Sequence, residues 1–289
     1  NITLAHVIQT NDKPKLLLCK DFPIPNFEEK ASILAEQVSK LGLENNNASY
    51  VLSPDEYKLL LVEAPDVGAN EIADAVKWKI KDLLDNPVEE MAITVFPVPD
   101  DAYRGQTKMV YVVAALKSKI REIVELVTSA ELELVAIDIP ELVMMNLSAK
   151  CADDSNGLAF LDLRGSGSTM NLCKDGSIYL TRHLNTRMDE DVLNSVDWDN
   201  IRERLVLEIQ RSLDYYESQL GKPSVNKVLL APRQSDSEAL AEQLNSVMSV
   251  RVECMDISKS IDSPEDLTLE LQEKCLMAIG GALRQERAA

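Results

Sequence analysis

Histidine is nearly absent from this chain, which has only His6 and His183. Two isolated histidines give little material for a histidine-rich metal site or for a serine nucleophile with a histidine base. We expect both to lie in strands, packed or half exposed. The acidic clusters lack the alternating ligand spacing of a calcium loop, so we expect solvated loops there. These clusters are Asp100-Asp101, Asp153-Asp154 and Asp189-Glu190-Asp191.

Basic residues are scarce as well. The chain has 30 lysines and arginines against 48 aspartates and glutamates, which gives a formal net charge of −18. A chain of this charge repels phosphate backbones, which argues against nucleic-acid binding. An acidic surface suits a basic partner instead, and the cytosolic tails of inner-membrane proteins tend to be basic.

Long apolar runs and paired cysteines are also missing. The longest apolar run, Met109–Leu116, is far too short to span a membrane, so any membrane attachment is expected to come through a partner. The five cysteines are scattered and form no C-x-x-C pair, which predicts reduced thiols in the cytoplasm. No signal peptide opens the chain, and Asn1 begins inside a strand-like pattern, so we expect the native N-terminus to lie upstream.

Apolar residues, in contrast, are plentiful. They make up 45% of the 289 residues, enough to fill two cores. The run from Asp153 to Gly157 is the best linker candidate. Strand hairpins followed by helices occur on both sides of it, which predicts a duplicated α/β unit with mixed sheets. The expected helices are 27–41, 70–84, 117–130, 140–149, 199–220, 236–247 and 267–284. The expected strands after the first fifty residues are 57–65, 91–99, 107–116, 132–140, 158–163, 168–174, 177–183, 225–231 and 250–257.

The main candidate site follows the strand at 158–163. This strand ends near Asp162 and leads into a turn of small residues: Gly165, Ser166, Gly167, Ser168 and Thr169. Such a turn lets backbone N–H groups face a phosphate, with the carboxylate at its mouth. Arg164 stands where a second glycine is usual. Its guanidinium could pair with a phosphate or fill the space that a phosphate would take.

The long helix predicted at 199–220 gives a second set of candidates. Its buried stripe is Ile201, Leu205, Ile209, Leu213, Tyr216 and Leu220. A flanking polar face has the spacing i, i+3, i+4 and i+7: Glu208, Arg211, Ser212 and Tyr215. Either this face converges on a ligand, or it is a surface pair of Arg211 with Glu208 beside a half-buried tyrosine. The sequence leaves both interpretations open.

With this order of elements, the segments EIQRSLDYY (208–216) and AIGGALR (278–284) resemble the PilM family of type IV pilus assembly proteins. The likeness covers essentially the whole chain and is closest to the MshI branch, which serves mannose-sensitive haemagglutinin (MSHA) pili. It implies an actin-like, FtsA-like α/β fold with two lobes, mixed sheets and an inserted α+β subdomain. The implied first lobe is 1–52 plus 118–152, the insertion is 53–117, and the second lobe is 157–289.

The resemblance also implies where a nucleotide would lie. In an actin-like fold two phosphate loops and an adenosine-binding segment hold it between the lobes. The first loop should lie in the hairpin at 11–14, which lacks Asp-x-Gly. The second loop matches at Asp162, with Arg164 at the family's glycine. The adenosine segment has Ala-Pro-Arg-Gln at 231–234 in place of Gly-Gly, which compromises close backbone approach. The polar face at 208–215 resembles the face that contacts adenine and ribose.

We therefore expect a non-enzymatic cytoplasmic scaffold, peripheral at the inner membrane. The implied partners are the cytosolic tail of a PilN-like bitopic membrane protein and other pilus assembly platform proteins. The groove is expected near the 53–117 insertion. The alternative is a switch that binds ATP with magnesium and hydrolyses it little or not at all; a sugar or acetate kinase would need intact phosphate loops. Trp78 and Trp198 are expected to pack in the core or beside a helix, although an indole at a peptide groove would be an anchor.

Overall fold

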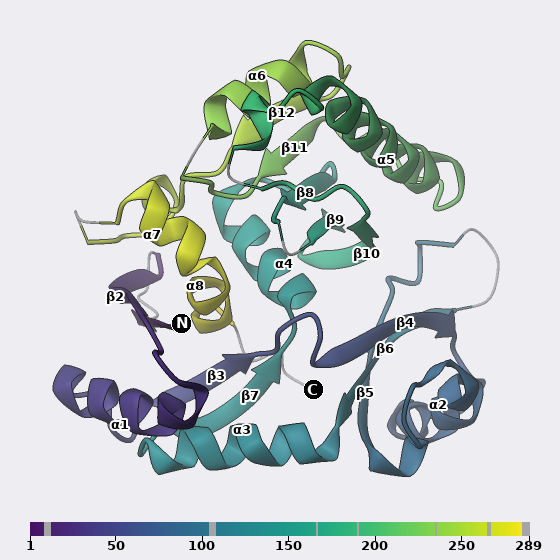
Figure 1. Ribbon diagram of the computed structural model, residues 1–289. Coiled ribbons are helices and arrows are strands. Elements are labelled where there is room, and N and C mark those ends of the chain that lie inside the picture. Colours follow the sequence, from purple (N-terminus) through teal and green to yellow (C-terminus); the bar gives the residue numbers. More distant parts are fainter. Residues whose placement is uncertain are drawn as a thin grey trace. The chain divides into compact units, whose positions relative to one another are not determined.

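The structure is a computed structural model that describes residues 1–8, 13–103, 108–165, 167–189, 191–234, 236–264 and 267–284. The chain divides into two compact units, coloured along the sequence in Figure 1. The first unit contains Asn1–Ile2 and Phe22–Pro140, and the second contains Thr3–Asp21 and Glu141–Ala289. This division differs from the predicted lobes because residues 3–21 and 141–152 belong to the second unit, and the lobe boundaries themselves stay a prediction.

The elements alternate between strands and helices along most of the chain. The strands are β1 (Ile2–Ile8), β2 (Lys15–Phe22), β3 (Asn47–Val51), β4 (Tyr57–Glu63), β5 (Met91–Pro97), β6 (Met109–Leu116), β7 (Glu133–Asp138), β8 (Leu158–Asp162), β9 (Ser168–Lys174), β10 (Ser177–Leu184), β11 (Lys227–Leu230) and β12 (Arg251–Cys254). The α-helices are α1 (Lys30–Leu41), α2 (Ile72–Ile80), α3 (Lys117–Ser129), α4 (Pro140–Cys151), α5 (Trp198–Ser218), α6 (Ser237–Asn245), α7 (Leu269–Lys274) and α8 (Leu276–Ala282). Short 3-10 helices are η1 (Phe27–Glu29), η2 (Ala69–Glu71), η3 (Lys81–Leu83), η4 (Val88–Glu90), η5 (Val192–Asn194) and η6 (Ile257–Lys259).

A three-stranded antiparallel sheet with the order β4-β6-β5 lies in the first unit. Side chains alternate between the two faces of a strand, so Val110 and Val112 of β6 share one face. On that face they form a buried cluster with Val76 and Ile80 of α2. The sheet and its helix lie within 53–117, the range expected for an inserted α+β subdomain, and that subdomain boundary stays a prediction.

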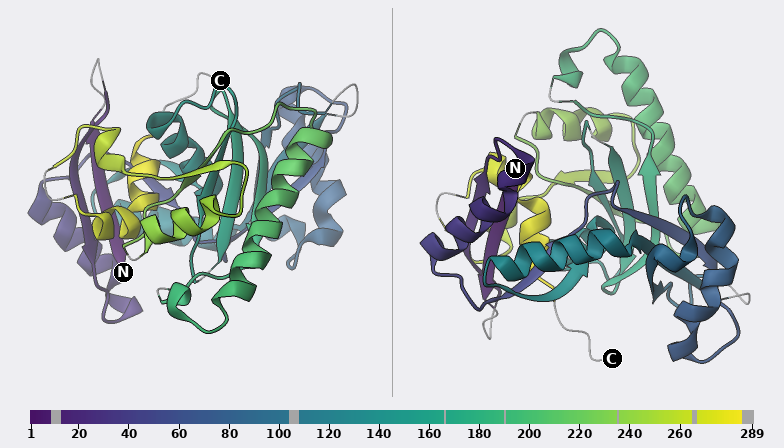
Figure 2. Two further views of the ribbon diagram at one scale, coloured as in Figure 1. Left: turned by 90° about the horizontal axis from the view of Figure 1, so that it is seen from above. Right: turned by 60° about the horizontal axis from the view of Figure 1, so that its bottom comes forward.

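The rest of the first unit has a smaller sheet, in which β3 pairs with β7 in parallel. Helices α1 and α3 pack against each other, as Figure 1 and the right-hand view of Figure 2 show. Leu34 and Val38 of α1 and Ile123 and Val127 of α3 are buried. Their spacing of four residues places each pair on one face of its helix.

The second unit contains a five-stranded sheet with the order β10-β9-β8-β11-β12. Its first three strands run antiparallel to one another, and β11 and β12 run parallel to β8. Counted along this sheet, the strands lie in the order third, second, first, fourth, fifth. The prediction of an α/β fold with mixed sheets is confirmed.

Helices cover both faces of this sheet. Asn171 of β9 donates to the backbone carbonyl of Glu141 in α4. In the next cross-strand pair, Arg182 of β10 lies opposite Met170 of β9, and the Arg182 guanidinium lies against the ring of Tyr215 in α5. Successive residues of a strand point to opposite faces of the sheet, so α4 and α5 lie on opposite sides of it.

The strand β12 forms one edge of the sheet, and a side chain shields it. Asn245 of α6 donates through Nδ2 to the carbonyl of Val252 at 2.9 Å and accepts the Val252 N–H through Oδ1 at 2.8 Å. The amide therefore makes the same pair of hydrogen bonds that a neighbouring strand would make.

The predicted helix at 267–284 is in fact two short helices, and that prediction was wrong in this respect. They meet at Cys275, which is fully buried beside the buried Leu276. A bend at this point lets both consecutive side chains reach the core. A Cβ placed on Gly280 of α8 would lie 2.5 Å from Val143 and 2.8 Å from Leu147 of α4, so glycine permits close packing of the two helices.

The predicted helix at 70–84 is shorter than expected, since α2 is flanked by the 3-10 helices η2 and η3. The default expectation for Trp78 was also wrong, because its side chain is 77% exposed, whereas Trp198 is buried as expected. Both histidines lie in strands, as predicted. No helix in the described ranges is both long and apolar enough to cross a bilayer.

Candidate functional site

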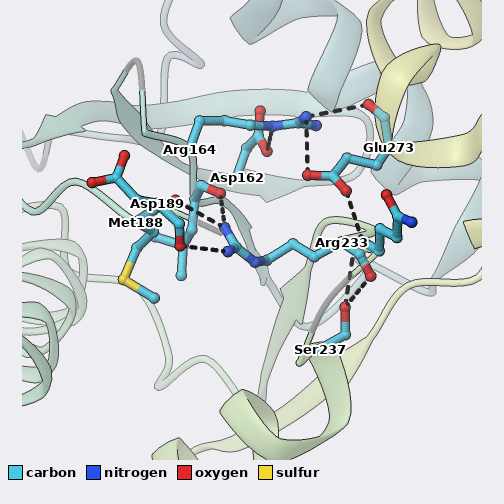
Figure 3. A network of polar contacts seen from close by, with 9 residues as sticks. Asp162, Arg164, Met188, Asp189, Arg233, Ser237 and Glu273 are labelled. Atoms are coloured by element: carbon cyan, nitrogen blue, oxygen red, sulfur yellow. Dashed lines mark hydrogen bonds and ion pairs between the residues drawn. The ribbon is translucent and has the colours of Figure 1, made fainter. Parts of the chain in front are cut away.

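The carboxylate of Asp162 already has a partner within the chain. Asp162 ends β8 and is 6% exposed. Arg164 donates through Nε to Asp162 Oδ1 at 2.8 Å, as the dashed lines in Figure 3 show. The sequence left two roles open for Arg164, which were to pair with a phosphate or to fill the space of one. In the structure its guanidinium lies on the Asp162 carboxylate at the mouth of the turn.

Glu273 of α7 holds the other end of the same guanidinium. Arg164 Nη1 lies 3.6 Å from Glu273 Oε1 and donates to the Glu273 backbone carbonyl at 3.2 Å. The second carboxylate oxygen of Glu273 accepts the N–H of Gln234 at 2.6 Å. Glu273 therefore joins three segments that are distant in sequence: the turn after β8, the segment after β11, and α7 (Figure 3).

Arg233 occupies the position expected for the adenosine-binding glycines. It is 3% exposed, and its guanidinium donates to the carbonyls of Leu163, Met188 and Asp189. Ser237, at the start of α6, accepts the Arg233 N–H and donates to its carbonyl at 2.7 Å. Burial lowers the pKa of the Arg233 guanidinium, and the negative charge of Glu273 partly offsets that. The side chain thus points back into the protein and links its own segment after β11 to the segments that follow β8 and β10.

The turn itself needs its glycines for structural reasons. A side chain on Gly165 would collide with the carboxylate of Asp189, and Gly167 has a φ of +149° that side-chain-bearing residues rarely adopt. Ser168 starts β9 with 1% exposure, and its hydroxyl oxygen has no hydrogen-bond partner in the described chain. Ser168 is thus buried in the sheet and not presented to solvent. Ser166 lies outside the described residues.

The polar face predicted on α5 does not converge on this turn. Ser212 is buried, and its hydroxyl donates to the Glu208 carbonyl one helical turn earlier. Tyr215 is half-buried with the guanidinium of Arg182 4.9 Å from its ring centre, and Arg211 is exposed. Among the described residues, no hydrogen bond or ion pair joins this face to Asp162 or Arg164.

Glu208 has a structural role that the sequence did not indicate. Its carboxylate accepts the backbone N–H groups and the side chains of both Asn185 and Thr186, at 2.8 to 3.2 Å. Burial raises the pKa of Glu208, but these hydrogen bonds outweigh it and leave the pKa below its ordinary value. The surface pair of Arg211 with Glu208, one of the two interpretations that the sequence left open, does not form in the described chain, because the loop after β10 takes up the Glu208 carboxylate.

Sequence reasoning also missed a polar cluster on the α4 side of the sheet. Glu141, in the first turn of α4, is completely buried, and its Oε1 lies 3.5 Å from Nε2 of His183. The other ring nitrogen of His183 lies 3.3 Å from the hydroxyl of Thr169. The strand register places Asp162, Thr169 and His183 in one row across β8, β9 and β10. Only the pairing of the strands reveals this row, because the residues are far apart in sequence.

The groups around the turn do not fit a triphosphate. Its two guanidinium groups, on Arg164 and Arg233, are balanced by the nearby carboxylates of Asp162 and Glu273, so the turn offers no excess positive charge. Asp162 is engaged by the guanidinium of Arg164. Proline at 232 removes a backbone donor where the fold family uses glycine. In the part of the chain that the structure describes, no group of three or more His, Cys, Asp or Glu is placed to hold a metal ion.

Comparison with known proteins places the fold. No family model matches the chain, and no curated protein matches it. It is similar to a solved structure described as the PilM-PilN type IV pilus biogenesis complex, with 20% identity and a TM-score of 0.71, covering 97% of this chain and 94% of the other. It is also similar to the cytoplasmic domain of EpsL, an inner-membrane component of the type II secretion system of Vibrio cholerae. That likeness has 10% identity and a TM-score of 0.52, and it covers 98% of this chain and 96% of the other.

The likeness to the PilM-PilN structure extends over nearly the whole length of both chains. The chain therefore has the actin-like α/β fold, built as in the solved PilM–PilN structure.

Proposed function

We propose that this chain is a non-enzymatic cytoplasmic scaffold of type IV pilus biogenesis that binds the cytosolic tail of a PilN-like inner-membrane protein. The observation that carries the non-enzymatic part is the pairing of Asp162 with Arg164, because it uses up the carboxylate that a nucleotide-dependent mechanism would need. The likeness to the PilM–PilN structure supports the choice of partner. The acidic composition supports a basic tail.

The finer parts of the proposal come from the sequence resemblance. They are service of MSHA-type pili, contact with other platform proteins, and a location at the inner membrane reached through the partner. The division into a first lobe (1–52 plus 118–152), an insertion (53–117) and a second lobe (157–289) belongs to the same proposal. In it, the insertion carries the tail-binding surface.

Binding of the tail is the direct test. A synthetic peptide of the cytosolic tail of the PilN-like partner should bind the purified chain at micromolar concentrations in fluorescence anisotropy. A scrambled peptide of the same composition separates sequence recognition from charge attraction. Absence of binding by the native tail at these concentrations rejects the scaffold proposal.

The alternative, an ATP-binding switch, predicts a different result. A ligand at 100 times its dissociation constant stabilises a protein by about 2.7 kcal/mol. We expect no change in the melting temperature when ATP and magnesium are added, because the turn is satisfied by the chain's own arginines. A saturable rise in melting temperature with ATP and magnesium, absent with magnesium alone, would favour the switch.

A further inference from the structure

Several arginines of the second unit form no ion pair within the described residues. This is unexpected, because carboxylates outnumber lysines and arginines by 48 to 30 along the chain. Arg202 of α5, for example, pairs with Asp199 at 2.9 Å. The arginines without such a partner in the described ranges are Arg182, Arg187, Arg204 and Arg211.

Two of these arginines lie on one stripe of α5. Arg204, Glu208, Arg211 and Tyr215 follow one another at intervals of four, three and four residues, so their side chains lie on one side of the helix. Arg204 and Arg211 are exposed, whereas Glu208 and Tyr215 are half-buried. The stripe therefore presents two guanidinium groups to solvent and has one carboxylate between them.

The strand β10 and the loop after it bring the other two arginines to the same stripe. The guanidinium of Arg182 lies 4.9 Å from the centre of the Tyr215 ring. Arg187 is exposed and directly follows Thr186, whose N–H and hydroxyl donate to the Glu208 carboxylate at 3.2 and 2.8 Å. We call the surface along this line the arginine seam, and its members are Arg182, Arg187, Arg204 and Arg211.

The carboxylates closest to the seam in sequence are engaged elsewhere. Both oxygens of Glu208 accept hydrogen bonds from the loop after β10. The side chain of Asp189 is directed toward Gly165, where its carboxylate takes the space that a Cβ would need. The seam thus sets four guanidinium groups against the single charge of Glu208, and it is a positive surface on a chain of charge −18.

The seam is narrow, which decides what can occupy it. Glu203 and Asp214 are exposed on α5 and lie about 90° or more around the helix from the stripe. A flat anionic membrane pressed against α5 would meet these two carboxylates as well as the arginines. A second copy of the chain would bring a charge of −18 against an equal charge. A slender acidic segment meets mainly the seam, because charges more than about 10 Å away are screened by salt.

We propose that the arginine seam binds an acidic, extended segment of another protein. Guanidinium groups hold carboxylates through paired, charge-assisted hydrogen bonds, and arginine and tyrosine are both enriched at protein interfaces. This inference goes beyond the proposed function, because the seam would repel a basic membrane tail. A scaffold joins at least two proteins, and the seam supplies a surface for a second one with the opposite charge.

The test uses a labelled poly-glutamate peptide as the probe, with poly-glutamine as its neutral counterpart. In fluorescence anisotropy, poly-glutamate should bind the unaltered chain saturably and poly-glutamine should not. Arg204→Gln with Arg211→Gln should weaken the binding of poly-glutamate by about tenfold or more. Both positions are exposed, so circular dichroism should show an unchanged fold.

Two further variants separate local recognition from general charge. Lys20→Gln with Arg121→Gln removes the same formal charge from exposed positions on β2 and α3, and it should leave affinity for poly-glutamate within about twofold. Arg204→Lys with Arg211→Lys keeps the charge but loses the forked donor geometry, so it should weaken binding by about three- to fivefold.

The outcomes keep this proposal apart from the scaffold proposal. Affinity for the PilN-like tail peptide should stay within about twofold when Arg204 and Arg211 are changed to glutamine. Equal binding of poly-glutamate by the glutamine variants of the seam and of the control positions would overturn the seam and leave the scaffold proposal standing. So would the absence of saturable binding by the unaltered chain. Binding to phosphatidylglycerol vesicles that depends on the two arginines, without peptide binding, would overturn the seam in favour of a membrane contact, and self-association with that dependence would favour a second copy.

Discussion

Glu208 illustrates how one side chain can stabilise a loop at the edge of a candidate site. Its carboxylate accepts four hydrogen bonds from Asn185 and Thr186. We expect Glu208→Ala to lower the free energy of unfolding by about 1–3 kcal/mol, because the loop's donors lose a charged acceptor. Denaturant unfolding would measure this. The control is Glu203→Ala, at an exposed position on the same helix, which should change the free energy of unfolding by less than about 0.5 kcal/mol.

The same carboxylate gives the stabilisation a defined pH dependence. Its pKa is lower in the folded state than in the unfolded chain, so the unfolded chain binds more protons as the solution becomes acidic. The contribution of Glu208 is therefore fully present at neutral pH and is lost as the pH falls from about 5 toward 3. The stability difference between the unaltered chain and Glu208→Ala should shrink over that interval, and a constant difference would contradict the assigned role.

Sequence reasoning at the scale of residues found the turn but not its partners. Asp162 and Arg164 are close in sequence, so their proximity could be foreseen. Glu273 lies more than a hundred residues later and carries no local signal, so its ion pair with Arg164 could not be foreseen. The partners of Glu208 were missed for the same reason, because they lie on the loop after β10 and not on its own helix.

At the scale of elements, the packing of α8 on α4 gives a second stability prediction. Gly280→Ala introduces a methyl group 2.5 Å from Val143 and 2.8 Å from Leu147. Alanine favours a helix by about 1 kcal/mol over glycine, but crowding in a packed core costs about 1–3 kcal/mol. We expect a net loss of stability and a lower melting temperature.

A matched control distinguishes crowding from a general effect of replacing glycine. A Cβ at Gly68 would meet only Glu71 at 3.7 Å, which is an ordinary contact. Gly68→Ala should therefore change stability by less than about 1 kcal/mol. Equal effects at the two positions would show that helix packing does not require Gly280.

Most helices and strands could be predicted because their apolar periodicity is strong. The buried positions of α5, for example, include Leu205, Ile209 and Tyr216, all of them on the predicted stripe. The failures come from tertiary packing, which overrides local sequence preference. The interruption at Cys275 arises from tertiary burial of two consecutive side chains, and the exposure of Trp78 contradicts the usual preference of tryptophan for the interior.

At the scale of the whole molecule, net charge should govern the rate of partner capture. A chain of charge −18 attracts a basic tail over a distance that salt shortens. Raising the ionic strength from about 0.05 to 0.5 M should slow association by about tenfold or more and change dissociation much less. Stopped-flow measurement with the tail peptide would check this, and an association rate independent of salt would contradict it.

The overall architecture could be predicted in outline because the pattern of a strand hairpin followed by helices recurs along the chain. The α/β fold with mixed sheets follows from that pattern and from the family resemblance. The extent of the compact units could not be predicted in the same way. The N-terminal hairpin belongs with the second unit through tertiary contacts that leave no trace in local sequence.

The amide of Asn245 has a consequence for self-assembly. Exposed strand edges readily recruit further strands, and proteins that must stay dispersed have to block them. Because Asn245 already satisfies the N–H and carbonyl of Val252, another polypeptide would have to expel this side chain before it could extend the sheet beyond β12. Any filament that this molecule forms would have to grow through a different surface.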